Sequence, residues 1–284
     1  MKNLLIYTNS AKEFSDENKT LVKLQIDNSL DLGWKREDIL LFTNFPYEYN
    51  GVKSKIVSDK LDVEWDRTSN KIFVIKDLLE KGLLQQGELY WYHDFDAYQN
   101  EVITEEELGL NKEGQIGLTG YGYKNQINGG SFFFRVNWTT YSTFSAWCRK
   151  TLEIVRTRAD EKTMTDMALR PIKWRHESMG KWYDTIKVEG AIAWTEPTPD
   201  GSEEALTYTE YKLLDISYNF GQRCPQLRYK HSKKPLKVLH FHPYYPFNNY
   251  NGYLNIDIFM NGHNKHKVPM MSDRLAKIFK QYGY

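Results

Sequence analysis

The chain has 284 residues, with 38 lysines and arginines against 37 aspartates and glutamates, so its formal net charge is +1. Its 40% hydrophobic and 15% aromatic content is enough to bury a core, which excludes a disordered chain. The near-zero net charge excludes broad, sequence-independent nucleic-acid binding, which needs a concentrated basic face. The two cysteines, Cys148 and Cys224, are too few for a disulfide framework. Since the apolar runs are far shorter than the roughly 20 residues that cross a bilayer, we expect no integral membrane segment and a cytoplasmic location.

The first half of the chain alternates between expected strands and expected helices. Apolar runs predict strands over residues 4–7, 38–43, 88–93, 115–119 and 131–136. Ser15 is expected to cap a first helix, and Thr68-Ser69 a second one that ends at Gly82. A third, long helix is expected over 138–156. This alternation favours an α/β fold with a mixed, mostly parallel sheet flanked by helices.

The second half of the chain is less regular from about residue 170. A Pro- and Gly-containing loop over 195–202, a last strand over 236–240 and a basic C-terminal helix over 270–284 are expected there. The loop is too short and too late in the chain for a convincing linker, and the sequence holds no internal repeat. We therefore interpret residues 1–284 as a single domain.

A pair of aspartates follows the third expected strand. Asp94 and Asp96 come directly after the run 88–93, which is apolar on both faces as a central strand would be. Ligands of open α/β sheets bind outside the carboxyl ends of the strands. Carboxylates two residues apart can point the same way and hold a hard divalent cation, Mn²⁺ or Mg²⁺. Although an Asp-Xaa-Asp triplet also occurs by chance, its place at a strand end favours a metal site.

Three short motifs, taken in chain order, resemble nucleotide-sugar glycosyltransferases with the GT-A (Rossmann-like) fold. Residues 89–96 (LYWYHDFD) resemble the strand-plus-DxD signature of these enzymes. Residues 128–135 (NGGSFFFR) are similar to the Asn-(Ala/Gly)-Gly strand start of glycosyltransferase family 8-like enzymes, and 238–243 (VLHFHP) to their late strand ending in His-Phe. The resemblance implies a retaining hexosyl- or pentosyltransferase that moves a sugar from a nucleotide-sugar donor, above all a UDP-sugar, to a hydroxyl acceptor. It also implies a metal site formed by Asp94, Asp96 and His240.

His242 is the alternative metal ligand. His240 and His242 lie on the same face of an extended segment, because side chains alternate with a period of two. Either histidine could therefore bind the metal, and the resemblance favours His240. A hydrogen-bonded structural histidine is the ordinary interpretation of a histidine at a strand end.

Two features depart from the family pattern. The Lys-Pro-Trp segment usual after the late histidine is absent, so the lysine that neutralises the leaving diphosphate must come from elsewhere, and the alternatives are Lys233, Lys234, Lys237, His242 and Lys265. The family's Asp-Gln-Asp stretch is only approximated, by Asp160-Glu161 and residues 165–169. An inverting enzyme would instead need a carboxylate base beside the acceptor hydroxyl, for which the candidates are Asp160, Asp166 and Glu189.

The remaining site residues are assigned by their place in the expected fold. Nucleotide contacts are expected from the end of the first strand, the cap of the second helix and the DxD triplet, namely Thr8, Asn9, Arg67, Lys71 and Phe95. Substrate contacts are expected from Asn128, Gly129, Gly130 and His242, since glycine allows a sugar to approach the backbone. Asp166 is the candidate catalytic residue that contacts the transferred sugar or the acceptor hydroxyl. Each assignment has an ordinary structural alternative. Thr8 and Asn9 could form a simple turn, Arg67 and Lys71 could be solvated surface charges, and residues 128–130 could form a β-turn before a strand. Asp166 could be an acidic residue at a helix N-terminus, where the helix dipole favours it.

Two other classes of protein fit part of this pattern. A metal-dependent nucleotidyltransferase also places paired aspartates at strand ends, but it usually has a basic, Gly-rich segment after the first strand, which residues 8–13 lack. A non-catalytic sugar-binding module would use aromatic side chains, for which the candidates are Trp91, Tyr98, Tyr121, Tyr123, Trp174 and Trp182. The acceptor is left open among a glycan, a lipid, a protein side chain and, less favoured, a modified base in DNA. The pattern specifies no oligomeric state.

Overall fold

The computed structural model describes residues 1–58, 69–110, 115–120, 127–164, 201–206, 209–221, 229, 232–241 and 270–284; at 155–164, 201, 202 and 204 it describes the backbone alone. The first strands of its large sheet are β1 (Lys2–Tyr7), β2 (Ile39–Thr43), β3 (Glu48–Tyr49), β4 (Val52–Ile56) and β5 (Leu89–His93). The later strands of this sheet are β7 (Ile116–Gly120), β8 (Ile127–Arg135) and β9 (Tyr211–Leu214). Their spatial order is β3-β4-β2-β1-β5-β8-β7-β9.

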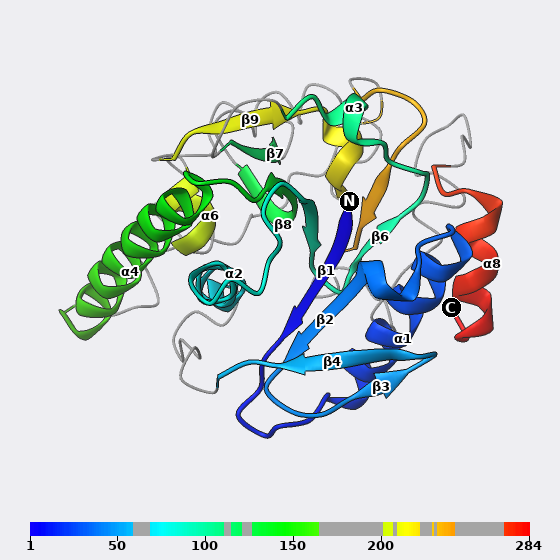
Figure 1. Ribbon diagram of the computed structural model, residues 1–284, viewed down its shortest axis with the longest axis horizontal. Helices are drawn as coiled ribbons and strands as arrows, with labels where there is room; N and C mark the ends of the chain where they lie inside the picture. Colours follow the sequence, from blue (N-terminus) through cyan, green and yellow to red (C-terminus); the bar gives the residue numbers. More distant parts are fainter. Residues whose placement is uncertain are drawn as a thin grey trace.

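The large sheet is mixed, with more parallel than antiparallel pairs among its described strands. Strand β1 runs parallel to both β2 and β5, and β4 and β9 run parallel to β2 and β7. The antiparallel pairs are β3 with β4, and β8 with each of β5 and β7. The α/β fold class expected from the sequence is therefore confirmed (Figure 1).

A second, small sheet lies beside the large one in the order β10-β11-β6. Its strands are β6 (Ala97–Gln99), β10 (Phe220–Gly221) and β11 (Val238–His240). Strand β11 pairs antiparallel with β6, so that His240 lies opposite Ala97. Since β6 begins three residues after Asp94, this pairing brings the late histidine back to the aspartate pair.

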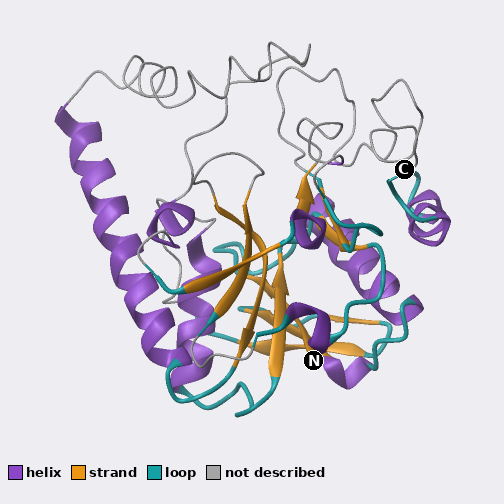
Figure 2. Ribbon diagram, turned by 90° about the horizontal axis from the view of Figure 1, so that it is seen from above, coloured by secondary structure: helices purple, strands orange, loops and turns teal. Residues whose placement is uncertain are grey.

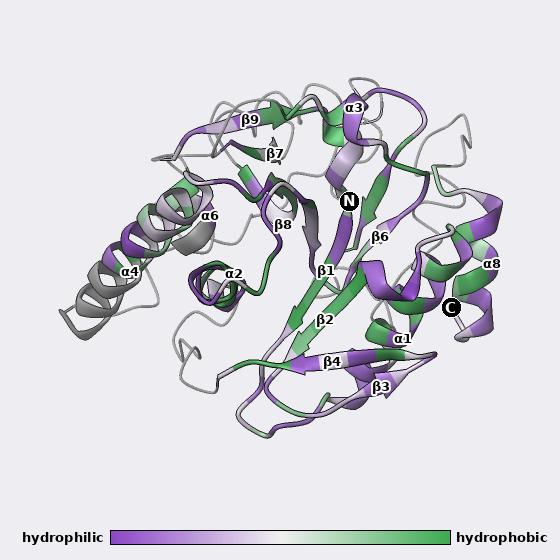
Figure 3. Cartoon of the chain, viewed as in Figure 1, coloured by the Kyte–Doolittle hydropathy of each residue, from purple (hydrophilic) through white to green (hydrophobic). Residues whose placement is uncertain are grey.

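Helices cover both faces of the strands (Figure 2). The described helices are α1 (Asp16–Asp31), α2 (Asn70–Glu80), α3 (Glu105–Leu108), α4 (Thr140–Met164), α6 (Gly201–Leu206) and α8 (Asp273–Gln281), with short 3₁₀ turns η1 (Arg36–Asp38) and η4 (Ile216–Asn219). The hydroxyl of Ser15 caps α1 by accepting from the Asn18 N–H, as expected. Along α8, apolar and polar residues alternate in Figure 3, and the apolar ones are buried against α1.

Strand β5 is buried on both faces because its neighbouring side chains enter different cores. Tyr90 and Tyr92 pack with residues of α2, α4 and α6, whereas Leu89 and Trp91 pack on the opposite side. Every residue of β5 is buried, which confirms the central strand that the apolar run predicts. The strand therefore delivers the aspartates that follow it from a rigid position.

The structure corrects one boundary that matters for the site. Strand β8 begins at Ile127, so Asn128, Gly129 and Gly130 lie inside a strand, and the alternative of a β-turn before the strand is wrong. The end of the loop expected over 195–202 is also helical, since α6 begins at Gly201. The interpretation of residues 1–284 as one domain stays a prediction. In the part of the chain that the structure describes, no helix has the length and apolar character needed to span a bilayer.

Candidate metal and nucleotide site

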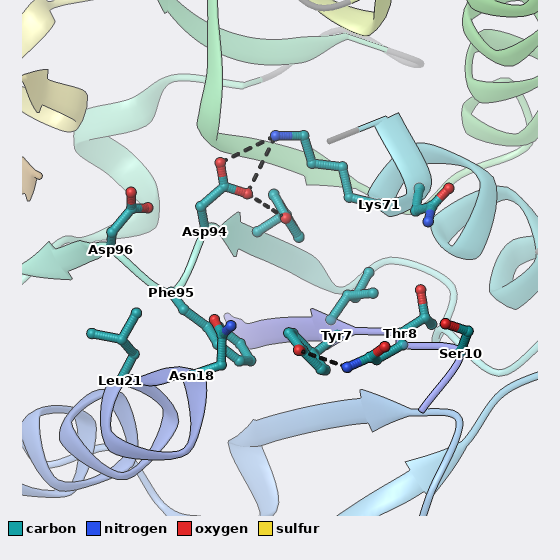
Figure 4. Close-up of a pocket in the computed structure, with 13 residues that line it drawn as sticks. Tyr7, Thr8, Ser10, Asn18, Leu21, Lys71, Asp94, Phe95 and Asp96 are labelled. Atoms are coloured by element: carbon teal, nitrogen blue, oxygen red, sulfur yellow. Dashed lines mark hydrogen bonds and ion pairs between the residues drawn. The ribbon is translucent and has the colours of Figure 1, made fainter. Parts of the chain in front are cut away.

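Asp94 and Asp96 occupy a tight turn between the two sheets. The Asp94 N–H donates to the Gly130 carbonyl at 2.8 Å, and the Ala97 N–H donates to the Asp94 carbonyl at 3.1 Å. Figure 4 shows both carboxylates on the same side of this turn, with the Phe95 ring on the other. The spacing of two residues thus places both acids on one side, while Phe95 is buried in the core beside α1.

His240 completes a group of three side chains that can bind a cation. One ligand atom from each of Asp94, Asp96 and His240 can be chosen so that all three atoms lie within 4.8 Å of one another. The His240 Nε2 lies 3.3 Å from Asp96 Oδ1. Two carboxylates and one imidazole are a donor set that fits a divalent cation. The residues that the sequence singled out as ligands therefore do come together.

Glycine at position 130 makes room for the histidine. A Cβ at this position would lie 2.1 Å from His240 Cε1, so the ring packs directly on the glycine backbone. The Asn128 Nδ2 lies 3.5 Å from His240 Nδ1, and the Asn128 Oδ1 accepts from the Gly130 N–H at 2.8 Å. Asn128 and Gly130 therefore support the histidine from β8, and both are buried.

Asp94 is also paired with a buried lysine. The Lys71 Nζ lies 3.2 Å from each carboxylate oxygen of Asp94. The Tyr92 hydroxyl donates to Asp94 Oδ1 at 2.6 Å. The Lys71 side chain is only 6% exposed, whereas that of Asp94 is 33% exposed and open to a ligand. Lys71, expected to reach donor phosphates, thus lies beside the candidate metal site.

A cavity of about 360 Å³ adjoins the aspartates. It is lined by Ile6, Tyr7, Thr8, Asn9, Ser10, Asn18, Leu21, Asn70, Lys71, Tyr92, Asp94, Phe95 and Asp96. The rings of Tyr7 and Phe95 stack with centroids 5.7 Å apart. Four residues expected to contact a nucleotide, Thr8, Asn9, Lys71 and Phe95, therefore line one cavity between β1, α1 and α2.

Asn9 also holds the loop that forms one wall of this cavity. Its Oδ1 accepts from the Ala11 N–H at 3.1 Å, and its Nδ2 donates to the Glu13 carbonyl at 3.1 Å. The main chain of Asn9 exchanges two hydrogen bonds with the Asn44 side chain, at 3.0 and 2.8 Å. The expected turn and the expected cavity position therefore coincide at this residue.

One buried acid near the site has no counterpart in the sequence interpretation. Glu203, in α6, is 9% exposed, and its Oε1 accepts from the Gly129 N–H at 2.9 Å. It follows a long segment, 165–200, that separates it from the other motifs, so no local spacing pointed to it. Asn18 and Tyr92 were also missed, because an asparagine in the first turn of a helix and a tyrosine within a strand carry no motif of their own.

Several expected residues lie elsewhere. The expected site residues Arg67, Asp166 and His242 lie outside the described residues, as do Glu189 and Lys265, and the side chain of Asp160 is not described. Lys234 donates to the Tyr229 carbonyl and, at 2.6 Å, to the Ser232 carbonyl. Lys237 pairs with Glu107 at 3.0 Å. Lys234 and Lys237 therefore contact their own surroundings, and among the described residues it is Lys71 that lines the cavity.

No protein-family model and no curated protein matches this sequence. Solved structures with a similar fold include the galactosyltransferase LgtC in complex with donor and acceptor sugar analogues, at 10% identity, with 99% of this chain and 96% of that chain covered and a TM-score of 0.45. A glycosyltransferase involved in glycosylation of the major capsid of PBCV-1 matches at 11% identity over 84% of this chain and 93% of that chain, with a TM-score of 0.40.

Mouse xyloside xylosyltransferase 1 also matches, at 12% identity, 84% of this chain, 96% of that chain and a TM-score of 0.40. The solved structures named here are thus all glycosyltransferases, the class of enzyme that the sequence motifs resemble. At these identities and TM-scores, the similar structures assign no functional role to any residue of this chain.

Proposed function

We propose that this chain is a metal-dependent glycosyltransferase that moves a sugar from a nucleotide-sugar donor, above all a UDP-sugar, to a hydroxyl acceptor. The observation that carries the proposal is the meeting of Asp94, Asp96 and His240 beside a cavity that both aspartates line. A divalent cation held there would supply Lewis-acid stabilisation of the diphosphate that leaves the anomeric carbon. A charged donor set and a cavity whose lining includes the aromatic rings of Tyr7 and Phe95 together suit a nucleoside diphosphate.

The chain's own residues have distinct parts in this proposal. Asp94, Asp96 and His240 would hold the cation, and Lys71 would donate to the diphosphate oxygens from the first turn of α2. Tyr7 and Phe95 offer an apolar wall for the base and ribose. Asn18, across the same cavity, offers an amide for the polar edge of the base.

The sugar would lie next to the glycines of β8. In the structure the space beside Gly129 is taken by Glu203 and Lys71, and the space beside Gly130 by the His240 ring. These side chains, and not bare backbone, would therefore border the sugar. From the sequence resemblance we further infer transfer with retention, which the anomeric configuration of the product, followed by NMR, tests directly. The acceptor that we favour is a hydroxyl on a glycan, with lipid, protein and modified DNA bases as further candidates.

The sugar-binding module is the weaker alternative. It needs exposed aromatic platforms, but Trp91 and Tyr98 are both fully buried. Trp91 donates its indole N–H to Ser131 Oγ at 2.9 Å, which is a structural contact. The other four aromatic residues named for this alternative lie outside the described residues.

Hydrolysis of nucleotide sugars without acceptor tests the proposal. A panel of UDP- and GDP-sugars is incubated with the chain and Mn²⁺, and release of the nucleoside diphosphate is measured. We expect slow hydrolysis of one donor, which stops on chelation with EDTA and returns when Mn²⁺ is added back. The proposal fails if no donor is hydrolysed and calorimetry shows no binding of any nucleotide sugar in Mn²⁺.

A further inference from the structure

Lys71 is a buried ammonium group that contacts both oxygens of a single carboxylate. Its Nζ lies 3.2 Å from Asp94 Oδ1 and from Asp94 Oδ2, and 5.6 Å from the centroid of the Tyr92 ring. Its side chain is 6% exposed. A charge this deep in a protein is tolerated only when it is paired. Asp94 is therefore the counter-charge of Lys71 in the metal-free chain.

A second carboxylate lies close to the same ammonium. A Cβ placed on Gly129 would lie 3.7 Å from Lys71 Nζ and 3.8 Å from Glu203 Oε1. The ammonium and the Glu203 carboxylate thus approach one point above the glycine, and the Gly129 N–H holds Glu203 there at 2.9 Å. Lys71 therefore has two acids within reach of its flexible side chain, and Glu203 is buried.

Asp94 cannot serve two cations equally well. The carboxylate that pairs with Lys71 is also one of the three candidate metal ligands. A divalent cation at Asp94 competes with the ammonium for the same oxygens, and the two positive charges repel each other. Binding of the metal must therefore weaken the Lys71–Asp94 pair, and the ammonium needs another partner.

We propose that Lys71 is a positioning residue that exchanges partners. It neutralises Asp94 while no metal is bound, and it turns to the diphosphate of the donor when a divalent cation takes over Asp94. Glu203 supplies the carboxylate that keeps the ammonium buried and oriented during this exchange. The inference rests on the proposed function, because it needs both a metal and a diphosphate at this site.

Mn²⁺ titration by calorimetry, without nucleotide, tests the first half of the exchange. Lys71→Met removes the competing charge and keeps the length of the side chain. We expect it to bind Mn²⁺ about tenfold more tightly than the wild-type chain, since a charge-assisted bond no longer has to be broken. Lys71→Arg keeps the charge and should bind Mn²⁺ as the wild type does. Lys76→Met is the matched control on the same helix, because Lys76 pairs with Glu80 on the surface.

UDP titration in saturating Mn²⁺ tests the second half. Lys71→Met should bind UDP about tenfold more weakly, because a charged donor to the diphosphate is lost. The two effects have opposite signs, tighter metal and weaker nucleotide, and a merely structural role would produce no such pattern. Lys76→Met should leave both affinities unchanged.

A double-mutant cycle assigns the part of Glu203. Glu203→Gln leaves Asp94 as the one of these two acids that can still pair with Lys71. The Lys71–Asp94 pair then competes more strongly with the metal, so Mn²⁺ affinity should fall several-fold in the wild-type background. In the Lys71→Met background the same change should have no effect, since Glu203 acts through the ammonium. An equal fall in both backgrounds would mean that Glu203 only adds negative charge, and that part of the inference would be overturned.

The failures are distinguishable. If the wild-type chain binds neither Mn²⁺ nor UDP, the proposed function itself fails. If the wild type binds both and folded Lys71→Met binds Mn²⁺ no more tightly, the exchange is overturned and the function stands. Should Lys71→Met not fold, as judged by thermal melting, Lys71→Gln serves in its place with the same expected signs.

Discussion

The two aspartates of the candidate metal site are held by different parts of the molecule. Asp94 follows the last strand residue of β5 in the large sheet, and its charge is balanced by buried Lys71. Asp96 precedes β6 in the small sheet, and its neighbour is the His240 imidazole at the end of β11. Asp94 is thus paired with a lysine ammonium group, and Asp96 with a histidine ring.

This difference sets what each acid does apart from binding a metal. A buried lysine stays charged only with a partner, so Asp94 contributes to the stability of the metal-free fold. The Asp96–His240 contact is also largely buried, with side chains 19% and 4% exposed, but removal of the Asp96 charge leaves no buried ammonium group without its carboxylate. We therefore expect Asp94, on the large-sheet side, to contribute both to the stability of the fold and to metal binding. Asp96, on the small-sheet side, should contribute to metal binding alone.

Asn substitutions of the two aspartates give the largest expected effect. Asp94→Asn and Asp96→Asn should each lower Mn²⁺-dependent donor hydrolysis on the order of 100-fold or more, because each removes a ligand of the ion that stabilises the leaving group. In EDTA, Asp94→Asn should also lower the free energy of unfolding by about 1–3 kcal/mol, since Lys71 loses the charge of the carboxylate that it contacts at 3.2 Å. Asp96→Asn should not. Initial rates and urea denaturation measure the two effects.

The difference in stability between Asp94→Asn and Asp96→Asn tests whether the two aspartates have these separate parts. Equal stability of the two variants in EDTA would show that Lys71 does not depend on Asp94, and a larger loss for Asp96→Asn would reverse the assignment. Glu80→Gln, at the surface partner of Lys76, is a control for removing one ion pair from α2. It should change the stability by less than about 1 kcal/mol.

The sequence predicts the metal-ligand set better than it predicts what surrounds it. Asp94 and Asp96 follow an unbroken apolar run, and His240 ends another, so strand periodicity alone places them at strand ends. Glu203 could not be predicted, because its contact with Gly129 joins residues 74 positions apart and depends on how α6 packs. The contact between Gly130 and His240 joins distant parts of the chain in the same way.

For a related reason, the sequence did not decide whether Gly129 and Gly130 lie in a turn or in a strand. Local propensity places Asn-Gly-Gly in a turn, and strands usually avoid glycine unless another group approaches closely. In this chain Glu203 packs above Gly129 and His240 above Gly130, so tertiary contacts override the turn preference. A strand start at Ile127 follows from those contacts and not from the local sequence.

Buried His93 gives the next expected effect, and it belongs to the large-sheet side. Burial lowers the pKa of His93 from 6.5 to about 4, although the Asp94 carbonyl opposes this shift. Because the folded chain binds this proton less readily than the unfolded chain, the stabilising effect is present above about pH 6.5 and is lost as the pH falls towards 4. The loss of free energy of unfolding should approach about 3 kcal/mol.

Urea denaturation at intervals from pH 7 to pH 4 measures this loss. His93 Nε2 lies 2.8 Å from Asn3 Oδ1, so His93→Gln keeps an amide donor near this oxygen and removes the titrating group. The variant should be less stable at pH 7, but its stability should fall less steeply between pH 6.5 and 4. Identical slopes for variant and wild type would show that other groups cause the acid sensitivity.

Two neighbouring glycines allow the finest comparison between the sheets, with the smallest expected effect. A Cβ at Gly130 would lie 2.1 Å from His240 Cε1, whereas a Cβ at Gly129 would meet Glu203 Cγ at 3.4 Å, an ordinary contact. Gly130→Ala must therefore displace the His240 ring, and we expect Mn²⁺ affinity to fall about tenfold, because the displaced imidazole is a poorer ligand.

Gly129→Ala should change Mn²⁺ affinity by less than about twofold, because its side of β8 faces Lys71 and Glu203 with room for one methyl group. Calorimetry on both variants, with melting curves to confirm folding, separates the two outcomes. If Gly129→Ala weakens Mn²⁺ binding as much as Gly130→Ala does, the imidazole is not what the glycine accommodates. Mn²⁺ binding would then depend on the side of β8 that faces Lys71, and not on the His240 ring that the small sheet contributes.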